Sequence, residues 1–460
     1  MSILSTKQKV AYGICRFGTS IFMNMVSLAT IWIYDNVFGL QDYIYMNASA
    51  VAIGKIVIAF SGFIFGYISD ILPPSKAGRR KIFIWIGSPL LALSFVMLFI
   101  PHLFISAEST LSVFFWLLIW NSSFNLFYGF LLTPYQSWMA EITTEEDRVS
   151  MSGLQNFTNL FSSLLGFGYV FLIPGLLKLS EGEGLSGTAS TILLATIVGF
   201  AVIEMLFFLP TLLMIKEKDV ERKERNLMRE FKVVLSNKDY VIWFMAQGLY
   251  SMGLTLITAL VLDFATDILG FTTMVPTVVF GLLVFGTVMV CFLAWIPISK
   301  RIGKKWSIII GFSFLVLVLP FSMIFKIIPA GTLTFDYIGY LYAFLIGVGL
   351  SAPYLFPYAI VADIAAMDEK KTNEKRAGMY TGFNSIPLNI FQAIALILVG
   401  FLNDEYKIFR LYWLGPIAAV FILASLPVLM LGNFDPFISK EKEVKQLDSI
   451  SNDKEIDETN

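Results

Sequence analysis

Charged side chains inside long apolar stretches are the residues of this chain best placed to do chemistry. Arg16 and Lys55 are the two basic residues of this kind, and Glu204 is an acidic one. A charge at the centre of a membrane-crossing helix costs about 2.5–3.5 kcal/mol on insertion scales, so it usually faces protein or water. Arg16 and Lys55 therefore predict a positively charged pocket for a polar or anionic solute, unless carbonyl groups or a nearby acid neutralise them.

Other titratable groups have both a chemical and a structural interpretation. Glu204 is either a proton carrier or an acid paired with a neighbour within an outer helix, and we favour the second. Asp263 and Asp267 are four residues apart, on one helical face, as a cation site or a gate requires. Acids near a helix end are more often interfacial, however. His102, the single histidine, is interpreted as a solvated residue at a helix end.

Uncharged polar side chains recur every three or four residues in some apolar stretches and hardly occur in others. This spacing places them on one helix face, as in helices that line an aqueous cavity. The alternative is that they form hydrogen bonds between helices. We favour the cavity because the polar residues are concentrated in some apolar stretches and nearly absent from others, rather than scattered singly over all of them. The predicted solute contacts, with the two cations included, are Arg16, Ser20, Asn24, Lys55, Tyr128, Gln155, Asn156, Asn384 and Asn389.

The elements that must position these residues are membrane-spanning helices. The chain is 57% hydrophobic and 15% charged, whereas soluble proteins are about 45–50% apolar and about 25% charged. A helix needs about 20 apolar residues to cross the hydrocarbon. Such stretches predict an all-α polytopic membrane protein with spans near 10–38, 43–70, 82–103, 109–140, 150–178, 189–215, 238–267, 273–298, 306–327, 333–364, 375–402 and 408–431.

The distribution of Lys and Arg orients these spans. Most of the 33 basic residues fall in connections on one side, whereas the other side carries Lys178, Lys326, Lys407 and Arg410. Basic connections stay in the cytoplasm, so both termini are predicted to be cytoplasmic. The protein itself is predicted to lie in the plasma membrane. A charged connection splits the chain into a bundle over 1–215, a linker over 216–237, a second bundle over 238–431 and a disordered tail over 432–460.

The two halves share short motifs that indicate an internal duplication. Gly303-Lys304-Lys305 corresponds to Gly78-Arg79-Arg80, and Ala362-Asp363 corresponds to Ala140-Glu141, at nearly equal spacing along the chain. Two related six-helix halves are typical of secondary transporters. Charges beside these motifs suggest ion pairs between the halves that close the cytoplasmic mouth. The predicted gating residues are Asp70, Arg79, Arg80, Glu141, Asp363 and Arg376, together with Lys375.

Several classes of protein are excluded by what the sequence lacks. It contains no GxxxxGK[ST] phosphate loop, no HExxH and no nucleophile elbow, so neither ATP hydrolysis nor another enzymatic activity is expected. The two cysteines, Cys15 and Cys291, lie in apolar stretches, which argues against disulfides and metal centres. We expect no cofactor and no nucleic-acid partner, and we expect a monomer in the lipid bilayer.

The loop motifs resemble those of the major facilitator superfamily. Residues 66–70 and 78–81 are similar to its signature after the second helix. Residues 357–380, PYAIVADIAAMDEKKTNEKRAGMY, resemble the glycoside–pentoside–hexuronide cation symporters, or melibiose-permease-like sugar transporters. Residues 12–20, 33–40 and 133–148 fit the same family. The resemblance implies twelve helices in two bundles that work by alternating access, with a sugar and Na+ or H+ as partners.

The chain departs from that family at the positions expected to hold the cation and the sugar. The carboxylates that the family places in helices one, two and four align with Ser20, Ile58, Gly62 and Leu132. The helix-five arginine region reads Gln155-Asn156, and the helix-eleven lysine region reads Asn389-Ile390. The basic position of helix two is kept as Lys55. Since a cation site needs anionic oxygen ligands, the family site is predicted to be lost.

Three functions remain open at this point. The first, which we favour, is a secondary transporter of a small polar solute such as a sugar. The second is the same fold moving an anionic or amphiphilic solute, such as an organic acid or a lysolipid, which Arg16 and Lys55 favour. The third is a receptor derived from a transporter, without flux.

Overall fold

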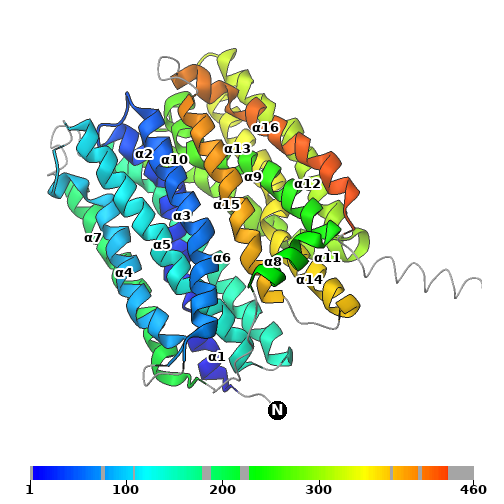
Figure 1. The fold of residues 1–460 in the computed structure, drawn as a ribbon. Helices are drawn as coiled ribbons and strands as arrows, with labels where there is room; N and C mark the ends of the chain where they lie inside the picture. Colours follow the sequence, from blue (N-terminus) through cyan, green and yellow to red (C-terminus); the bar gives the residue numbers. More distant parts are fainter. Residues whose placement is uncertain are drawn as a thin grey trace, which may run out of the picture.

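The computed structural model describes residues 4–73, 78–106, 109–143, 145–178, 188–217, 227–372, 377–401 and 407–433. These residues form twelve helical segments that are long and apolar enough to cross a membrane, which confirms the predicted number. The spans are arranged as two six-helix bundles, the predicted fold class (Figure 1). The predicted tail over 434–460 lies outside the described residues.

The first bundle contains six spans, of which the first is broken near Cys15. The break follows Gly13, where an added Cβ would lie 2.7 Å from the Leu154 side chain. Ser5 and Gln8 form a capping box at the start of the chain's first helix. The helices are α1 (Thr6–Gly13), α2 (Arg16–Asn36), α3 (Ile44–Ile71), α4 (Lys81–Phe99), α5 (Thr110–Ile142), α6 (Glu145–Lys178) and α7 (Thr188–Met214).

The second bundle follows a short helix, α8 (Leu227–Ser236), in the linker. The tenth span of the chain, which belongs to this bundle, runs to Thr372, beyond the predicted end at 364, because a second helix begins at Pro357. Five-residue π-helical stretches begin at Phe264 and Leu282. The helices are α9 (Lys238–Asp263), α10 (Met274–Gly281), α11 (Thr287–Ile302), α12 (Lys304–Val318), α13 (Leu333–Leu355), α14 (Pro357–Thr372), α15 (Ala377–Phe401) and α16 (Lys407–Leu431).

The two bundles meet closely on the side opposite the N-terminus, which we call the far side. There the Trp32 indole donates to Thr266 Oγ1 at 3.2 Å. A Cβ added to Gly175 on α6 would lie 2.6 Å from the Met274 backbone. Nearer the middle, Phe167 of α6 stacks on Phe285 at 3.7 Å between ring centroids. Helices α2 and α6 of the first bundle therefore hold the second bundle at this side.

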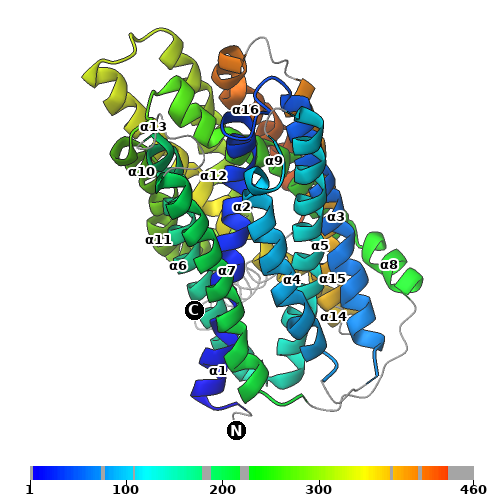
Figure 2. The ribbon, with the colours of Figure 1, turned by 90° about the vertical axis from the view of Figure 1, so that its left-hand side faces the viewer.

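Helices α3 and α15 join the bundles at both ends. On the far side, the Cβ built on Gly400 would lie 2.9 Å from Tyr45 Cα. On the side of the N-terminus, the N-terminal side, Phe63 of α3 lies 5.1 Å from Phe383 of α15 between ring centroids. Phe231 of α8 lies 4.8 Å from the same Phe383, and Figure 2 shows α8 beside these two helices.

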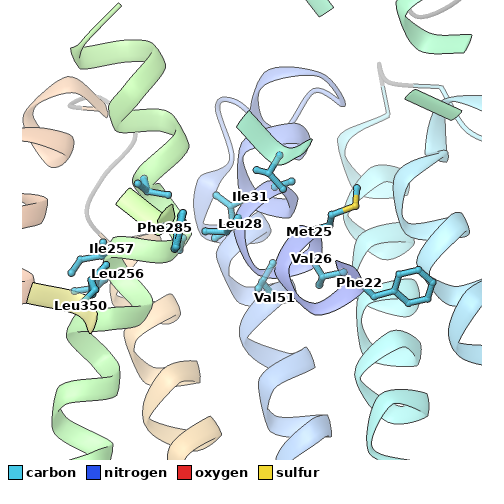
Figure 3. Close-up of a cluster of buried hydrophobic side chains, with 14 of the residues drawn as sticks. Phe22, Met25, Val26, Leu28, Ile31, Val51, Leu256, Ile257, Phe285 and Leu350 are labelled. Atoms are coloured by element: carbon cyan, nitrogen blue, oxygen red, sulfur yellow. The ribbon is translucent and has the colours of Figure 1, made fainter. Parts of the chain in front are cut away.

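Helix α2 lies at the centre of the apolar core. Its Phe22 stacks on Phe95 of α4 at 3.9 Å. Figure 3 shows Phe22 and Val26 directed into the first bundle, whereas Leu28 lies on the side of Phe285 and the second bundle. The side chains that Figure 3 shows here, those of Phe22, Val26, Leu28 and Phe285, are all buried. A helix with apolar contacts on both sides is fixed in position, and it can hold polar side chains at its N-terminal-side end.

Candidate functional site

The end of α2 nearest the N-terminus carries the clearest polar contact between helices. Arg16 and Ser20, one turn apart on α2, both donate to the Asn159 amide oxygen on α6. The Arg16 bond is long, at 3.4 Å. Asn24, a further turn along, has a buried amide nitrogen without a hydrogen-bond partner. The polar face of α2 that carries Arg16 and Ser20 is therefore directed at α6.

Gln155 belongs to a separate buried group. Its amide nitrogen donates to the Tyr135 hydroxyl at 2.8 Å, and Tyr135 and Tyr12 each donate to the other's backbone carbonyl. Their rings stack at 4.4 Å between centroids. Asn156, the next residue, is exposed, because successive residues of a helix point about 100° apart. The structure therefore does not bring Gln155 and Asn156 together.

Lys55 stands half-buried on α3, and it forms no hydrogen bond or ion pair with any residue that the structure describes. It shares a helix face with Phe63, two turns away, which packs on α15. It therefore lies on the side of α3 that is directed at the second bundle. A cation in this place attracts an anionic or strongly polar group of a solute.

The predicted contacts on α15 and α5 have different surroundings. Asn384 is buried, and its amide oxygen has no hydrogen-bond partner. Asn389 is buried too, but its amide nitrogen donates to the Ser385 carbonyl of the same helix at 2.8 Å. Tyr128 is half-buried on α5, with its ring 5.9 Å from that of Phe124. Asn384 is thus the group on α15 with an unused acceptor.

Close packing of α3 on α5 fills the region where the family places its helix-two carboxylates. A Cβ built on Gly62 would lie 3.1 Å from Thr133 Oγ1, and one on Gly54 would overlap the Asn121 amide. Leu132, the aligned helix-four position, is buried. Among the described residues, no group of three or more His, Cys, Asp or Glu side chains is placed to hold a metal ion.

The acids outside this region differ from the sequence interpretation. Glu204 on α7 is fully buried, and none of the described basic residues pairs with it; its one hydrogen bond comes from the Ser88 hydroxyl at 2.9 Å. Asp263 is completely buried rather than interfacial, whereas Asp267 is exposed and accepts from the Thr266 hydroxyl. His102 is half-buried against the Phe38 ring, and this burial lowers its pKa.

The predicted gating residues of the first bundle form one cluster at the N-terminal side. Arg79 and Arg80, which precede α4, each place a guanidinium nitrogen 2.6 Å from a Glu141 oxygen at the end of α5. Arg80 is only 3% exposed and also donates to the Ser69 hydroxyl. The cluster therefore joins α3, α4 and α5 of the same bundle.

Glu217, the last described residue before the linker helix, caps α4. Its carboxylate accepts from the backbone nitrogens of Arg79, Arg80 and Lys81, the last two at 2.9 and 2.6 Å. A carboxylate at a helix N-terminus is favourable because it meets unpaired N–H groups and the positive end of the helix dipole. Sequence reasoning missed Glu217, although it lies in the charged connection that was identified.

The second bundle repeats this arrangement. Lys304 at the start of α12 forms an ion pair with Asp363 on α14, and the preceding Gly303 has φ +89°, as Gly78 has φ +88°. Lys81 donates to the Leu212 carbonyl at 2.8 Å, and Lys305 donates to the Met430 carbonyl at 2.8 Å. The positive-φ glycine and the ion pair lie at positions that the predicted duplication matches, whereas Lys81 and Lys305 are one residue out of that register.

The ion pairs that the structure describes join elements within a bundle, whereas the sequence predicted pairs between the two halves. Arg79 and Arg80 meet Glu141 in the first bundle, and Lys304 meets Asp363 in the second. Arg376 and Lys375 lie outside the described residues. Asp70 lies on α3, where its side chain is not described. A second residue outside the predicted contacts is Asn159, which accepts from Arg16 and Ser20.

Comparison with solved structures identifies the fold. A bacterial homologue of the human lysosomal transporter Spinster is similar with a TM-score of 0.65 and 10% identity, covering 93% of this chain and 97% of that one. A D-xylose–proton symporter has a TM-score of 0.60 and 15% identity, with 92% and 97% covered. These similarities show the fold of the major facilitator transporters.

A family model described as MFS/sugar transport protein matches residues 11–404, so the chain belongs to this family. A protein of Bacillus subtilis (strain 168) named uncharacterized symporter YjmB is 24% identical over 408 residues, which are 87% of this chain and 82% of the relative. The isoprimeverose transporter of Lactiplantibacillus pentosus is 22% identical over 402 residues, covering 85% and 79%. The protein is a multi-pass membrane transporter of a small-molecule solute and not an enzyme.

Proposed function

We propose that the protein moves a small sugar or sugar-like solute between its two bundles by alternating access, without using the family's cation site. Both termini lie in the cytoplasm in this proposal, and the protein works as a monomer in the plasma membrane. The isoprimeverose transporter among its relatives favours a saccharide. The positive connections on the N-terminal side support the orientation.

The observation that carries the proposal is a set of buried polar atoms with unused hydrogen-bonding capacity on facing helices. Asn24 on α2 has a free amide nitrogen, and Asn384 on α15 has a free amide oxygen. Arg16 makes one long bond to Asn159. An unpaired buried donor or acceptor costs about 1–3 kcal/mol, and the hydroxyl groups of a sugar both donate and accept. We therefore place the solute among α2, α3, α5, α6 and α15.

The proposal is tested with the purified full-length protein. A thermal-shift screen of pentoses, disaccharides and sugar acids, with and without Na+, identifies ligands because a bound ligand stabilises the native state. Uptake of the strongest ligand into proteoliposomes then measures flux. We expect stabilisation that does not depend on Na+, followed by uptake. Sodium-dependent binding would contradict the loss of the cation site, and binding without uptake would indicate a receptor.

A second candidate, transport of an anionic solute, is favoured by Lys55 and Arg16. Neither cation has an acidic partner among the described residues, and a cation within a membrane span is normally paired. A carboxylate on the solute would supply that pair. In the screen, this candidate requires that sugar acids or organic acids stabilise the protein more than the neutral sugars of the same size.

We further propose that Asp70, Arg79, Arg80, Glu141, Asp363 and Arg376 take part in opening and closing the N-terminal side. Far-side contacts through α2 and α6 support an arrangement that is closed on that side. On the N-terminal side, the described contacts between bundles run through α3, α15 and α8. The paired clusters within each bundle then keep the helix ends rigid while the bundles move.

A further inference from the structure

Glu204 is a buried acid that the proposed site does not use. It is the only Asp, Glu, Lys or Arg in the span Thr191–Met214, and its side chain is completely buried. One carboxyl oxygen accepts from Ser88 on α4 at 2.9 Å, whereas the other has no hydrogen-bond partner. An ionised carboxylate without a cation, in surroundings of this kind, carries a large desolvation cost. The protonated acid is the species that fits this place.

Glu204 also lies directly behind the helix that carries the proposed solute contacts. A Cβ added to Gly18 of α2 would lie 2.5 Å from Glu204 Cα and 2.6 Å from its Cβ. Arg16 and Ser20 lie on either side of Gly18 in the sequence, and they point to α6 on roughly the opposite face of α2. One helix thus separates the acid from the proposed solute site.

Polar groups connect the level of Glu204 with the N-terminal side. The Cys15 thiol lies 3.0 Å from Thr211 Oγ1, and the Thr211 hydroxyl donates to the Ala11 carbonyl at 2.7 Å. One turn further, the Gln8 amide donates to the Met214 carbonyl at 2.9 Å. The contacts of α7 with α1 and with the residue before α2 are therefore polar on the N-terminal side of Glu204, which is the direction from which a proton would arrive.

The other titratable groups on the helices around α7 have partners of their own. Arg16 bonds to Asn159, Tyr12 bonds to the Tyr135 carbonyl, and Lys81 bonds to the Leu212 carbonyl. Tyr169 is the exception, because its ring packs against Phe200 at 5.2 Å between centroids but its hydroxyl has no hydrogen-bond partner. None of the described charged groups at this interface pairs with Glu204, whose one hydrogen bond comes from the Ser88 hydroxyl.

We propose that Glu204 is a proton-binding site that couples proton uptake from the N-terminal side to the conformation of the transporter. The carboxylate takes up one proton and becomes a neutral acid, and the far-side-closed arrangement described above is the protonated one. Loss of the proton leaves a negative charge against α2 at Gly18, close to the end that carries Arg16. The two equilibria, protonation and conformation, then bias each other equally. This coupling rests on the proposed alternating-access function.

The proton site is tested by infrared spectroscopy of the full chain in proteoliposomes, with the proton itself as the ligand. We expect the carbonyl stretch of a protonated carboxyl group near neutral pH, and we expect Glu204→Gln to remove this band. Ser88→Ala should keep the band and shift its frequency, because the hydrogen bond to the acid is lost. If the wild-type protein shows no protonated carboxyl that Glu204→Gln removes, the proposal is wrong.

The coupling is tested by spin labels on cysteines placed at the exposed far-side residues Leu103 and Ile327, with Cys291→Ser as background and the buried Cys15 retained. Between about pH 5 and about pH 9, the wild-type distance distribution should shift from short to long separations. Glu204→Gln should hold the short distribution throughout. A pH-independent wild type, or a Glu204→Gln variant that still titrates, would overturn the coupling. Neither readout needs a solute, so their failure leaves the proposed transport function standing.

Discussion

At the scale of single residues, the structure separates cations that are paired from cations that are not. Arg79 and Arg80 share Glu141 in a tight cluster, whereas Lys55 has no acidic partner among the described residues. The first kind stabilises the fold, because breaking a buried ion pair leaves an uncompensated charge. The second kind is available to a solute. These two roles lead to opposite expectations for substitution.

Replacement of Lys55 should affect ligand binding and leave stability nearly unchanged. If the solute is anionic, Lys55→Met should weaken its binding about tenfold to a hundredfold, since a hydrogen bond to a charged group contributes about 1.5–3 kcal/mol. The measurement is a titration of the ligand from the thermal-shift screen. Lys55→Arg keeps the charge and serves as the control. Equal binding by Lys55→Met and the wild type would remove Lys55 from the site.

Replacement of Glu141 should destabilise the protein more than replacement of its counterpart Asp363. Arg80 is 3% exposed, whereas Lys304 is 31% exposed. Glu141→Gln should therefore cost about 3–5 kcal/mol, and Asp363→Asn about 1 kcal/mol or less. Thermal unfolding of the two variants in the same detergent compares them. Equal losses of stability would show that the duplicated pairs do not differ as their burial implies.

At the scale of helices, contacts between small residues and neighbouring backbone decide how the bundles are built. Helix α3 approaches α5 through Gly54 and Gly62, and α2 approaches α7 through Gly18. Small residues allow such approaches in membranes, where packing rather than water drives helix association. The close contact between α2 and α7, which places Glu204 behind α2, therefore depends on the absence of a side chain at position 18.

Gly18→Ala should force α2 and α7 apart. The new methyl group would lie 2.5 Å from Glu204 Cα, which is a backbone atom that cannot rotate away, and overpacking of this kind costs about 1–3 kcal/mol. Gly199→Ala on the same α7 is the matched control, because a Cβ there meets nothing within 4 Å. Thermal unfolding measures both. If the two variants unfold at the same temperature, the close approach at Gly18 is not maintained in the membrane.

The sequence was sufficient to predict where the membrane-spanning helices lie along the chain, but it did not predict which residues of neighbouring helices contact one another. Apolar length predicted all twelve spans, because crossing the hydrocarbon requires it. Periodicity placed Arg16, Ser20 and Asn24 on one face, but it did not reveal that Asn159 is the partner of the first two, since spacing along one helix carries no information about its neighbour. Asn156 was predicted together with Gln155, from which it points about 100° away on α6, and it is exposed. Glu204 was interpreted as an acid with a partner, and its isolation became visible only from the packing of α7.

At the scale of the whole molecule, alternating access requires the far-side contacts to separate. Gly175 of α6 lies against the Met274 backbone, and Trp32 bonds to Thr266. Both contacts join the two bundles. Their strength relative to the contacts on the N-terminal side sets the population of each conformation.

Gly175→Leu should shift this population towards a state that is open on the far side. The side chain would meet the Met274 backbone, from which a Cβ alone is 2.6 Å away, and about 1–3 kcal/mol of overpacking changes a two-state ratio roughly fivefold to a hundredfold. Spin labels at Leu103 and Ile327 report the change as longer distances. Gly168→Leu on the same helix, where a Cβ meets nothing within 4 Å, is the control. An unchanged distribution would place the far-side barrier elsewhere.

The pairing of α3 with α15 at both of its ends has a consequence for where molecules can enter. Tyr45 and Gly400 touch at one end, and Phe63 and Phe383 touch at the other. Helices α3 and α15 therefore form one closed flank of the boundary between the two bundles, and the bundles would separate on the flank opposite to it. A lipid-like cargo that entered sideways from the acyl chains would find this flank closed at both ends. On the opposite flank, α6 contacts α10 at Gly175 and Met274, so such a cargo would have to arrive on the N-terminal side of that contact.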